Sequence, residues 1–186
     1  MKTLVRLSKD SGMKGHYVAF DVETTGLDPS KGARVIEIGA VIINNREMID
    51  EFSSFINIGK NIPLAAQKIN GITNEMIGQA PKAEELFPEF IKFIGDAVLV
   101  SHNASFDCRF LRHEFGRIGL SFRSKCICTL RTSRKLFPKL PDYKLGTVYK
   151  HLFGSFPDQT QLHRALFDAK LTARIWLKII LKDGES

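Results

Sequence analysis

The sequence predicts an α/β fold with a mixed sheet, because of the order in which strand-like and helix-like segments follow one another. Three segments rich in β-branched and aromatic residues come first, at 17–20, 35–43 and 48–58. Further strand-like runs then alternate with helical patterns, which is typical of a sheet flanked by helices. A chain of 186 residues, 44% of them hydrophobic, is long enough for one domain with a full core.

The first half of the chain supplies the antiparallel part of this sheet. The apolar run 17–20 ends in the polar turn 24–26, which indicates a buried strand followed by a loop. The Asn44-Asn45 pair between the next two runs favours a tight turn, hence a hairpin or meander. From Ala83 apolar residues recur at helical spacing, and Pro88 is expected to kink this helix or delay its start.

The second half alternates strands with helices. A fourth strand is expected at 97–100, followed by a helix that Asn103 or Ser105 caps and that ends near Gly116 or Gly119. The remaining elements are a fifth strand at 125–129 and helices near 130–136, 143–152 and 164–181. In sheets of this kind, sites form at the carboxyl ends of parallel strands.

Neither a repeat nor a linker divides the chain, so we expect a short arm (1–13), a single domain (14–182) and a short tail (183–186). No run approaches the roughly 18 apolar residues of a membrane span, and the N-terminus lacks a signal-peptide core. A cytoplasmic protein without a membrane partner is therefore expected. The three cysteines, Cys108, Cys126 and Cys128, are odd in number and few, which favours reduced structural thiols.

The excess positive charge of the chain is concentrated in one region of the sequence. Its net charge is +7, whereas 109–150 holds eleven Lys or Arg against Glu114 and Asp142, or +9, which leaves −2 for the rest. A basic region suits a polyanion such as nucleic acid, although a solvated basic surface has the same composition.

Two carboxylates follow the first strand. Asp21 and Glu23 are two residues apart, so in an extended strand they point to the same face. Like charges this close repel unless a cation lies between them, and paired carboxylates suit Mg²⁺ or Mn²⁺. Taken alone, the pair also fits an exposed strand end with solvated acids.

Two further motifs place acids at helix starts. In the motif 101–107, an apolar strand leads to a polar turn and then to Asp107 in the first turn of a helix, where the helix dipole favours a carboxylate. In the motif 163–168, His163 precedes the last helix and Asp168 lies in its early turns, in otherwise apolar surroundings. An imidazole near a metal-bound water can act as a general base at neutral pH. Each motif alone also fits ordinary capping or surface residues.

Together, the three motifs resemble the DEDDh 3′–5′ exonucleases, a family typified by the proofreading epsilon subunit of bacterial DNA polymerase III. The resemblance rests on the motifs 20–26, 102–107 and 163–168, in the family's order, and spans about 17–180. A weaker block at 69–73 matches the family's substrate loop, where Asn70 stands at a position often taken by His.

The resemblance implies a ribonuclease-H-like fold with a five-stranded mixed sheet. It implies that two ions of Mg²⁺ or Mn²⁺ are held by Asp21, Glu23, Asp107 and Asp168, with His163 as general base. Nucleoside 5′-monophosphates would then leave one at a time from single-stranded or frayed 3′ ends. The site of the terminal nucleotide would be formed by Thr24, Thr25, Gly26, Leu27, Ile69, Asn70, Asn103 and Phe106.

DNA is the expected substrate, and two alternatives stay open. An exoribonuclease or oligoribonuclease would use the same metal site, because the choice depends on contacts with the 2′-OH that motifs do not reveal. A polymerase-associated subunit with little activity of its own would act mainly by docking. The chain ends a few residues after the last expected helix, which favours a free-standing exonuclease or a fragment of a longer protein.

Overall fold

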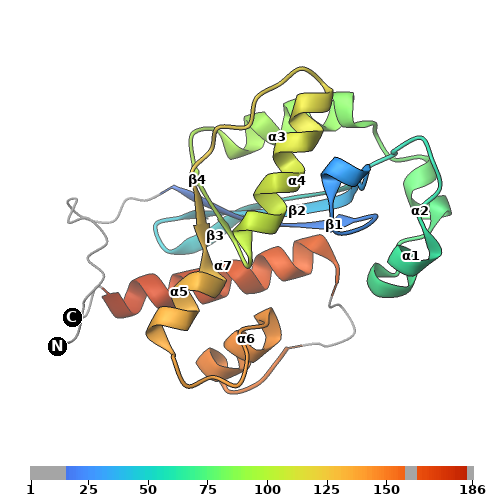
Figure 1. Cartoon of the computed structure of the whole chain (residues 1–186). Coiled ribbons are helices and arrows are strands. Elements are labelled where there is room, and N and C mark those ends of the chain that lie inside the picture. Colours follow the sequence, from blue (N-terminus) through green and yellow to red (C-terminus); the bar gives the residue numbers. More distant parts are fainter. Residues whose placement is uncertain (1–15, 158–162, 184–186) are drawn as a thin grey trace.

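A five-stranded mixed sheet lies at the centre of the molecule (Figure 1). The computed structural model describes residues 16–157 and 163–183, and the strand order is β3-β2-β1-β4-β5. The strands are β1 (Tyr17–Thr24), β2 (Val35–Asn44), β3 (Glu47–Phe55), β4 (Val98–Ser101) and β5 (Cys126–Cys128). The first three pair antiparallel, whereas β4 is parallel to β1 and β5 to β4. The predicted α/β class and mixed sheet are confirmed.

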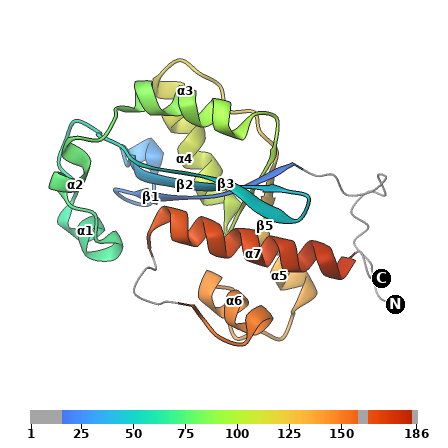
Figure 2. The same cartoon turned by 180° about the vertical axis from the view of Figure 1, so that it is seen from behind.

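Helices cover both faces of the sheet (Figures 1 and 2). One face carries α3 and α4, the other carries α7 with α6 outside it, and α1 and α2 lie together at one end of the sheet. The helices are α1 (Leu64–Asn70), α2 (Asn74–Gly78), α3 (Ala83–Ile94), α4 (Ala104–Arg117), α5 (Thr129–Leu136), α6 (Leu145–Phe153) and α7 (Ala165–Asp183), with a 3₁₀ turn η1 (Pro29–Lys31). Within the described part of the chain, no helix has the length and apolarity to cross a membrane.

Side chains of β1 alternate between two hydrophobic cores. Val18, Phe20 and Val22 are buried in the core beneath α3 and α4. Ala19 is buried in the core beneath α6 and α7, which also contains Trp176. Because alternation continues along a strand, the two acids that follow Ala19 at even spacing point toward the α7 face.

The turn between β2 and β3 is as tight as the sequence predicts. Asn44 pairs with Glu47, so two residues form the turn, and both have positive φ (47° at Asn45 and 69° at Arg46). Two successive residues of positive φ match the twist of an antiparallel hairpin, and asparagine adopts this conformation readily.

Three local features sharpen or correct the expectations from the sequence. The helix α3 begins at Ala83 and includes Pro88, so Pro88 does not delay its start. Asn103 precedes α4 but has a left-handed backbone (φ 79°) and makes no capping hydrogen bond, while the Ser105 hydroxyl donates to the Asn103 side chain. The predicted cap is therefore wrong. The short helices α1 and α2 lie at 59–82, where the sequence pattern predicted no element.

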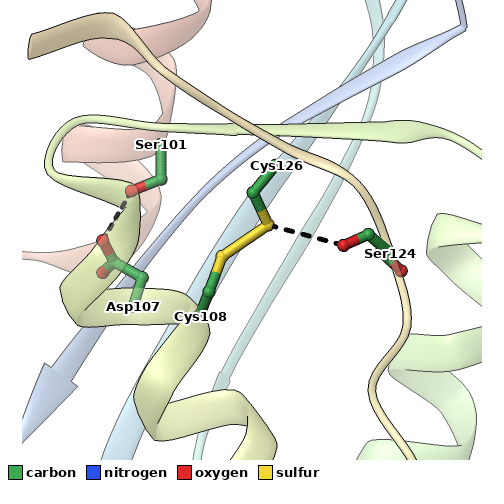
Figure 3. Close-up of a disulfide and its surroundings, with 5 residues drawn as sticks. All are labelled: Ser101, Asp107, Cys108, Ser124 and Cys126. Carbon is green, nitrogen blue, oxygen red and sulfur yellow. Dashed lines mark hydrogen bonds between the residues drawn. A yellow bond between two sulfur atoms is a disulfide. The ribbon is translucent and has the colours of Figure 1, made fainter. Parts of the chain in front are cut away.

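The expectation of three reduced thiols is also wrong. Cys108 on α4 and Cys126 on β5 form a disulfide (Figure 3). Cys128 is free and buried. The two partners are 18 residues apart and belong to different elements, so only the packing of α4 against β5 brings them together. The expected arm at 1–13 and nearly all of the expected tail at 183–186 lie outside the described residues.

Candidate metal and nuclease site

The carboxyl end of β1 positions the first two acids. Asp21 is half-buried and Glu23 is 9% exposed. Both lie an even number of residues after Ala19 in β1, so their side chains point to the same, α7-facing side of the sheet. Across the β1–β2 pair, Asp21 lies opposite Gly39 and Glu23 lies opposite Glu37. The predicted common face of the two acids thus follows from the strand geometry.

The third acid comes from the opposite face of the sheet. Asp107 is buried in the first turn of α4, and the Ser101 hydroxyl at the end of β4 donates a hydrogen bond of 2.5 Å to its Oδ2 (Figure 3). Because β4 is parallel to β1, Ser101 lies at the same edge of the sheet as Asp21. Ser101 was not predicted as a site residue, although it is the first residue of the motif 101–107.

The start of α7 completes the group. Asp168 is buried in the first turns of this helix, and exposed His163 lies immediately before Arg164 and Ala165. Ligand atoms of Glu23, His163 and Asp168 all lie within 4.8 Å of one another. Asp21 is near enough to Asp107 and Asp168 for their charges to shift its pKa. The structure therefore gathers all five predicted residues at one edge of the sheet.

Burial raises the pKa values of all four acids, and repulsion between the carboxylates adds to this for Asp21 and Glu23. Burial, followed by the charges of Asp107 and Asp168, raises the pKa of Asp21 well above its ordinary value. Burial and the Asp168 carboxylate raise the pKa of Glu23 to about 9. Burial raises the pKa of Asp107 to about 7 against the Ser101 hydrogen bond, and that of Asp168 to about 6 against the nearby His163. Such repulsion is relieved by a cation.

The residues present fit divalent metal ions. Among the described residues, none donates a hydrogen bond to the buried Oδ1 atom of Asp168, and none forms an ion pair with any of the four acids. An unpartnered buried carboxylate oxygen is costly unless something else binds it. Oxygen donors of this kind match Mg²⁺ and Mn²⁺ better than softer metals.

A loop after β1 presents Leu27 to solvent. Leu27 is 81% exposed, although large aliphatic side chains are usually buried. Hydrogen bonds close this loop at its base, from Thr25 N to Arg34 O and from Arg34 N to Thr25 Oγ1, both 2.9 Å. The Thr24 hydroxyl donates to Gly26 O at 2.7 Å. The two threonines therefore shape the turn that carries Leu27.

The other predicted substrate residues lie at the same end of the sheet, in different environments. Asn70 is buried, its amide donates to Thr24 O at 3.4 Å, and its Oδ1 accepts from Ile72 N at 3.0 Å. These bonds tie α1 to the end of β1 and leave Ile69 68% exposed. Asn103 is exposed and Phe106 is half-buried against Phe110.

Two cavities adjoin the start of α7. One of about 540 Å³ is bounded by His163 and Asp168 on one side and by Lys144 and Lys150 of the α6 region on the other. Another, of about 630 Å³, reaches from Arg164 to Ile69 and Asn70. His102 fixes the segment that leads into α6, because its Nε2 donates a hydrogen bond to Tyr143 O at 2.7 Å. Burial lowers the pKa of His102, which favours the neutral ring.

Two buried glutamates, which sequence reasoning missed, fasten loops of the site. Glu114 accepts from Arg34 Nε at 2.7 Å, from Arg34 Nη2 at 2.9 Å and from Val35 N at 3.2 Å. Glu37 binds the Arg164 guanidinium and Ala165 N in the same manner. Each pair joins residues about 80 or more positions apart, so no local pattern revealed it.

Comparisons with known proteins agree with this geometry. The RNase T family model, described as exonuclease, matches residues 18–176. DNA polymerase III subunit epsilon of Aquifex aeolicus is 37% identical over 173 residues, which cover 92% of this chain and 84% of that protein. DNA polymerase III PolC-type of Caldanaerobacter subterraneus is 38% identical over 183 residues, which cover 96% of this chain but 12% of the polymerase. The chain thus spans only a small part of the PolC-type relatives.

Solved structures share the same architecture. Exonuclease X in complex with 5′ overhanging duplex DNA has a TM-score of 0.73 and 29% identity, with 90% of this chain and 93% of that one covered. The nuclease domain of 3′hExo, a DEDDh family member bound to rAMP, has a TM-score of 0.78 over 94% of this chain and 96% of that one. At 24% identity, the second comparison concerns the fold.

Proposed function

Since this chain belongs to the exonuclease family and is of the DEDDh type, we propose that it removes nucleoside 5′-monophosphates from the 3′ ends of DNA. The reaction depends on two divalent metal ions, Mg²⁺ or Mn²⁺. The observation that carries the proposal is the convergence on one exposed histidine of four acids that form no ion pair with any described residue. When bound, the metals supply positive charge that offsets the charge on the phosphate under attack.

Each site residue has a defined task in this proposal. Asp21, Glu23, Asp107 and Asp168 hold the metals, and Ser101 orients Asp107 through its hydroxyl. The His163 imidazole accepts the proton of the attacking water, since it is exposed beside Glu23 and Asp168.

The terminal nucleotide packs against apolar side chains. Leu27 lies on the loop after β1 and Ile69 lies on α1, which Asn70 ties to the end of β1. Both side chains are exposed, so they offer apolar faces to the terminal base. Thr24, Thr25 and Gly26 shape the backbone next to it, and Asn103 and Phe106 border it from the start of α4. Asn70 acts by holding the end of helix α1 against the end of β1.

The strand itself is attracted by the basic region of the chain. Lys144 and Lys150 are exposed and border the same cavity as His163 and Asp168. Lysine side chains beside an active centre bind phosphates without regard to sequence. We assign the backbone just upstream of the scissile phosphate to this cavity.

A matched pair of labelled strands tests the proposal. A 5′-labelled DNA 20-mer and the same sequence in RNA are incubated with metal-stripped protein, with and without Mg²⁺ or Mn²⁺. We expect a ladder that shortens from the 3′ end, faster for DNA, and no cleavage in EDTA. Release of the label as a mononucleotide at the earliest times would contradict the polarity, and faster RNA cleavage would favour the exoribonuclease alternative.

Two variants control the assay. Asp107→Asn removes one proposed metal ligand and should abolish the ladder. Glu89→Gln removes an exposed acid that pairs with Lys92 on α3, outside the acidic group, and should leave cleavage unchanged. Equal activity of the Asp107→Asn variant and the wild type would attribute the cleavage to a contaminant or to another site.

We also propose that a DNA polymerase is a partner, because the relatives include an epsilon subunit and PolC-type polymerases. The test is gel filtration of the protein mixed with the replicative polymerase of its own source. Co-elution at physiological salt is expected, and separate elution at micromolar concentrations would overturn this part of the proposal.

A further inference from the structure

The backbone at the start of α7 decides where His163 lies. His163 has φ of 65°, a left-handed conformation that few non-glycine residues adopt. It is exposed, yet its ligand atoms lie within 4.8 Å of those of Glu23 and Asp168. An exposed side chain keeps such a position only when the adjacent backbone is fixed. The contacts that fix this backbone come from β2.

Glu37 of β2 binds the two residues that follow His163. Its side chain is 2% exposed. Arg164 Nη2 donates to Oε1 at 2.9 Å, and Nε donates to Oε1 at 3.2 Å and Oε2 at 3.3 Å. Ala165 N donates to Oε2 at 3.2 Å, so one carboxylate binds a guanidinium and a backbone N–H of the first helical turn.

Gly39 allows this turn to press against β2. Glu37 and Gly39 are two residues apart in the strand and so share its α7-facing side. A Cβ atom at Gly39 would lie 2.1 Å from Leu166 N and 2.3 Å from Ala165 C, which leaves no room for any side chain. The first turn of α7 is therefore seated on β2 by a hydrogen-bonded carboxylate and a close backbone approach.

Arg164 is held from a second side. Its guanidinium carbon lies 5.1 Å from the centre of the Phe55 ring on β3, in a cation–π contact. Both carboxylate oxygens of Glu37 thus accept N–H donors, although Glu37 lies opposite Glu23 in the sheet. The Glu37 charge also contributes to the raised pKa values of Asp21, Glu23 and Asp168.

We propose that Glu37 is a positioning residue for His163. By binding Arg164 and Ala165 N, it holds the backbone turn from which the imidazole reaches Glu23 and Asp168. This inference rests on the proposed function for the role of His163, whereas the seating of the turn can be measured without any nuclease activity.

The kinetic test is a double-mutant cycle with Glu37→Gln and His163→Ala. The amide keeps the size of Glu37 but loses the charge that binds Arg164, and a misplacement of about 1 Å can reduce a rate about 100-fold. We expect kcat on a single-stranded DNA to fall about 30-fold in Glu37→Gln with little change in KM. In the His163→Ala background the same change should have almost no effect, because Glu37 acts through His163. Additive losses would overturn the proposal.

A matched control uses another ion pair of α7. Glu51 of β3 pairs with Lys170 at 2.8 Å, away from the first turn of the helix. Glu51→Gln should leave kcat and KM unchanged. If Glu37→Gln fails to fold, Arg164→Lys replaces it in the double-mutant cycle. Lysine keeps the positive charge but cannot make the bidentate contact with the Glu37 carboxylate. An unchanged kcat in a folded Glu37→Gln or Arg164→Lys variant would contradict the proposal.

Hydrogen–deuterium exchange measures the turn directly. In the wild type, Asp168 N donates to Arg164 O at 3.0 Å and Ala165 N to Glu37. Exchange in a peptide covering 164–168 should be at least tenfold faster in Glu37→Gln and unchanged in Glu51→Gln. If the wild type has no nuclease activity but exchange is still faster in Glu37→Gln than in the wild type, the proposed function is refuted and the seating of the turn stands. Unchanged exchange would refute the seating.

Discussion

Two sets of buried acids in this molecule have opposite surroundings. Glu37 and Glu114 each bind an arginine side chain and a backbone N–H. Asp21, Glu23, Asp107 and Asp168 gather at the end of β1, and none of them forms an ion pair in the described part of the chain. The first set joins distant segments, whereas the second set repels itself.

The difference separates structural acids from functional ones. A buried carboxylate with an arginine fork has its charge and lone pairs satisfied, so it fixes a loop and offers nothing to a ligand. A buried carboxylate without such a partner keeps its oxygens available at the expense of stability. Burial alone does not distinguish the two sets, because Glu37 and Asp107 are equally hidden.

The largest expected effect comes from Asp21→Asn. The amide preserves shape but removes a metal ligand, so cleavage of single-stranded DNA should fall at least about 1,000-fold, or ~4 kcal/mol. Removal of one repelling charge should leave the metal-free melting temperature unchanged or higher. Cleavage within tenfold of the wild type, or marked destabilisation, would place Asp21 among the structural acids.

The second effect concerns His163→Ala. Loss of a general base should lower kcat by about 100- to 1,000-fold. Because the four acids remain, the Mn²⁺ affinity measured by calorimetry should change less than about threefold, whereas Asp21→Asn should weaken it much more. An equal loss of metal binding in both variants would make His163 a ligand instead.

The third effect concerns Glu114→Gln. Glu114 is 1% exposed beside Arg34, which is 15% exposed, and a broken buried ion pair costs about 3 kcal/mol of unfolding free energy. Urea denaturation measures this loss. The exposed Glu89–Lys92 pair is the control, since Glu89→Gln should change stability by about 0.5 kcal/mol or less. Equal small effects would show that the Glu114 contact is not structural.

The smallest effect is the pH dependence of the metal-free protein. The pKa values of Glu23, Asp107 and Asp168 are raised to about 9, 7 and 6, whereas unfolded carboxyl groups titrate near pH 4. The folded state therefore binds more protons between about pH 4 and 9, and its stability falls as pH rises through this window.

Differential scanning calorimetry in EDTA should detect this loss of stability as a lower melting temperature at pH 8 than at pH 5. Mg²⁺ should restore most of it at pH 8. The slope should be smaller in Glu23→Gln, and an equal slope in that variant would assign the pH dependence to other groups.

The sequence was sufficient for the sheet and for the family. Strand-like runs predicted five strands, and the three motifs predicted an exonuclease resembling the epsilon subunit, a family that the family model and the epsilon relative confirm. It failed at 59–82, where α1 and α2 are short and depend on packing. It also failed for Cys108 and Cys126, because their separation of 18 residues says nothing about how α4 meets β5.

Local chemistry explains what the sequence by itself determined. Alternation along β1 places Asp21 and Glu23 on one face, and helix periodicity places Asp107 and Asp168 in first turns, so the acids are visible in their own segments. Only the tertiary structure decided which distant segments the two other buried acids join. Glu114 meets Arg34 and Glu37 meets Arg164 across gaps of 80 and 127 residues. A hydrogen bond depends on distance in space, and no single segment contains both of its ends.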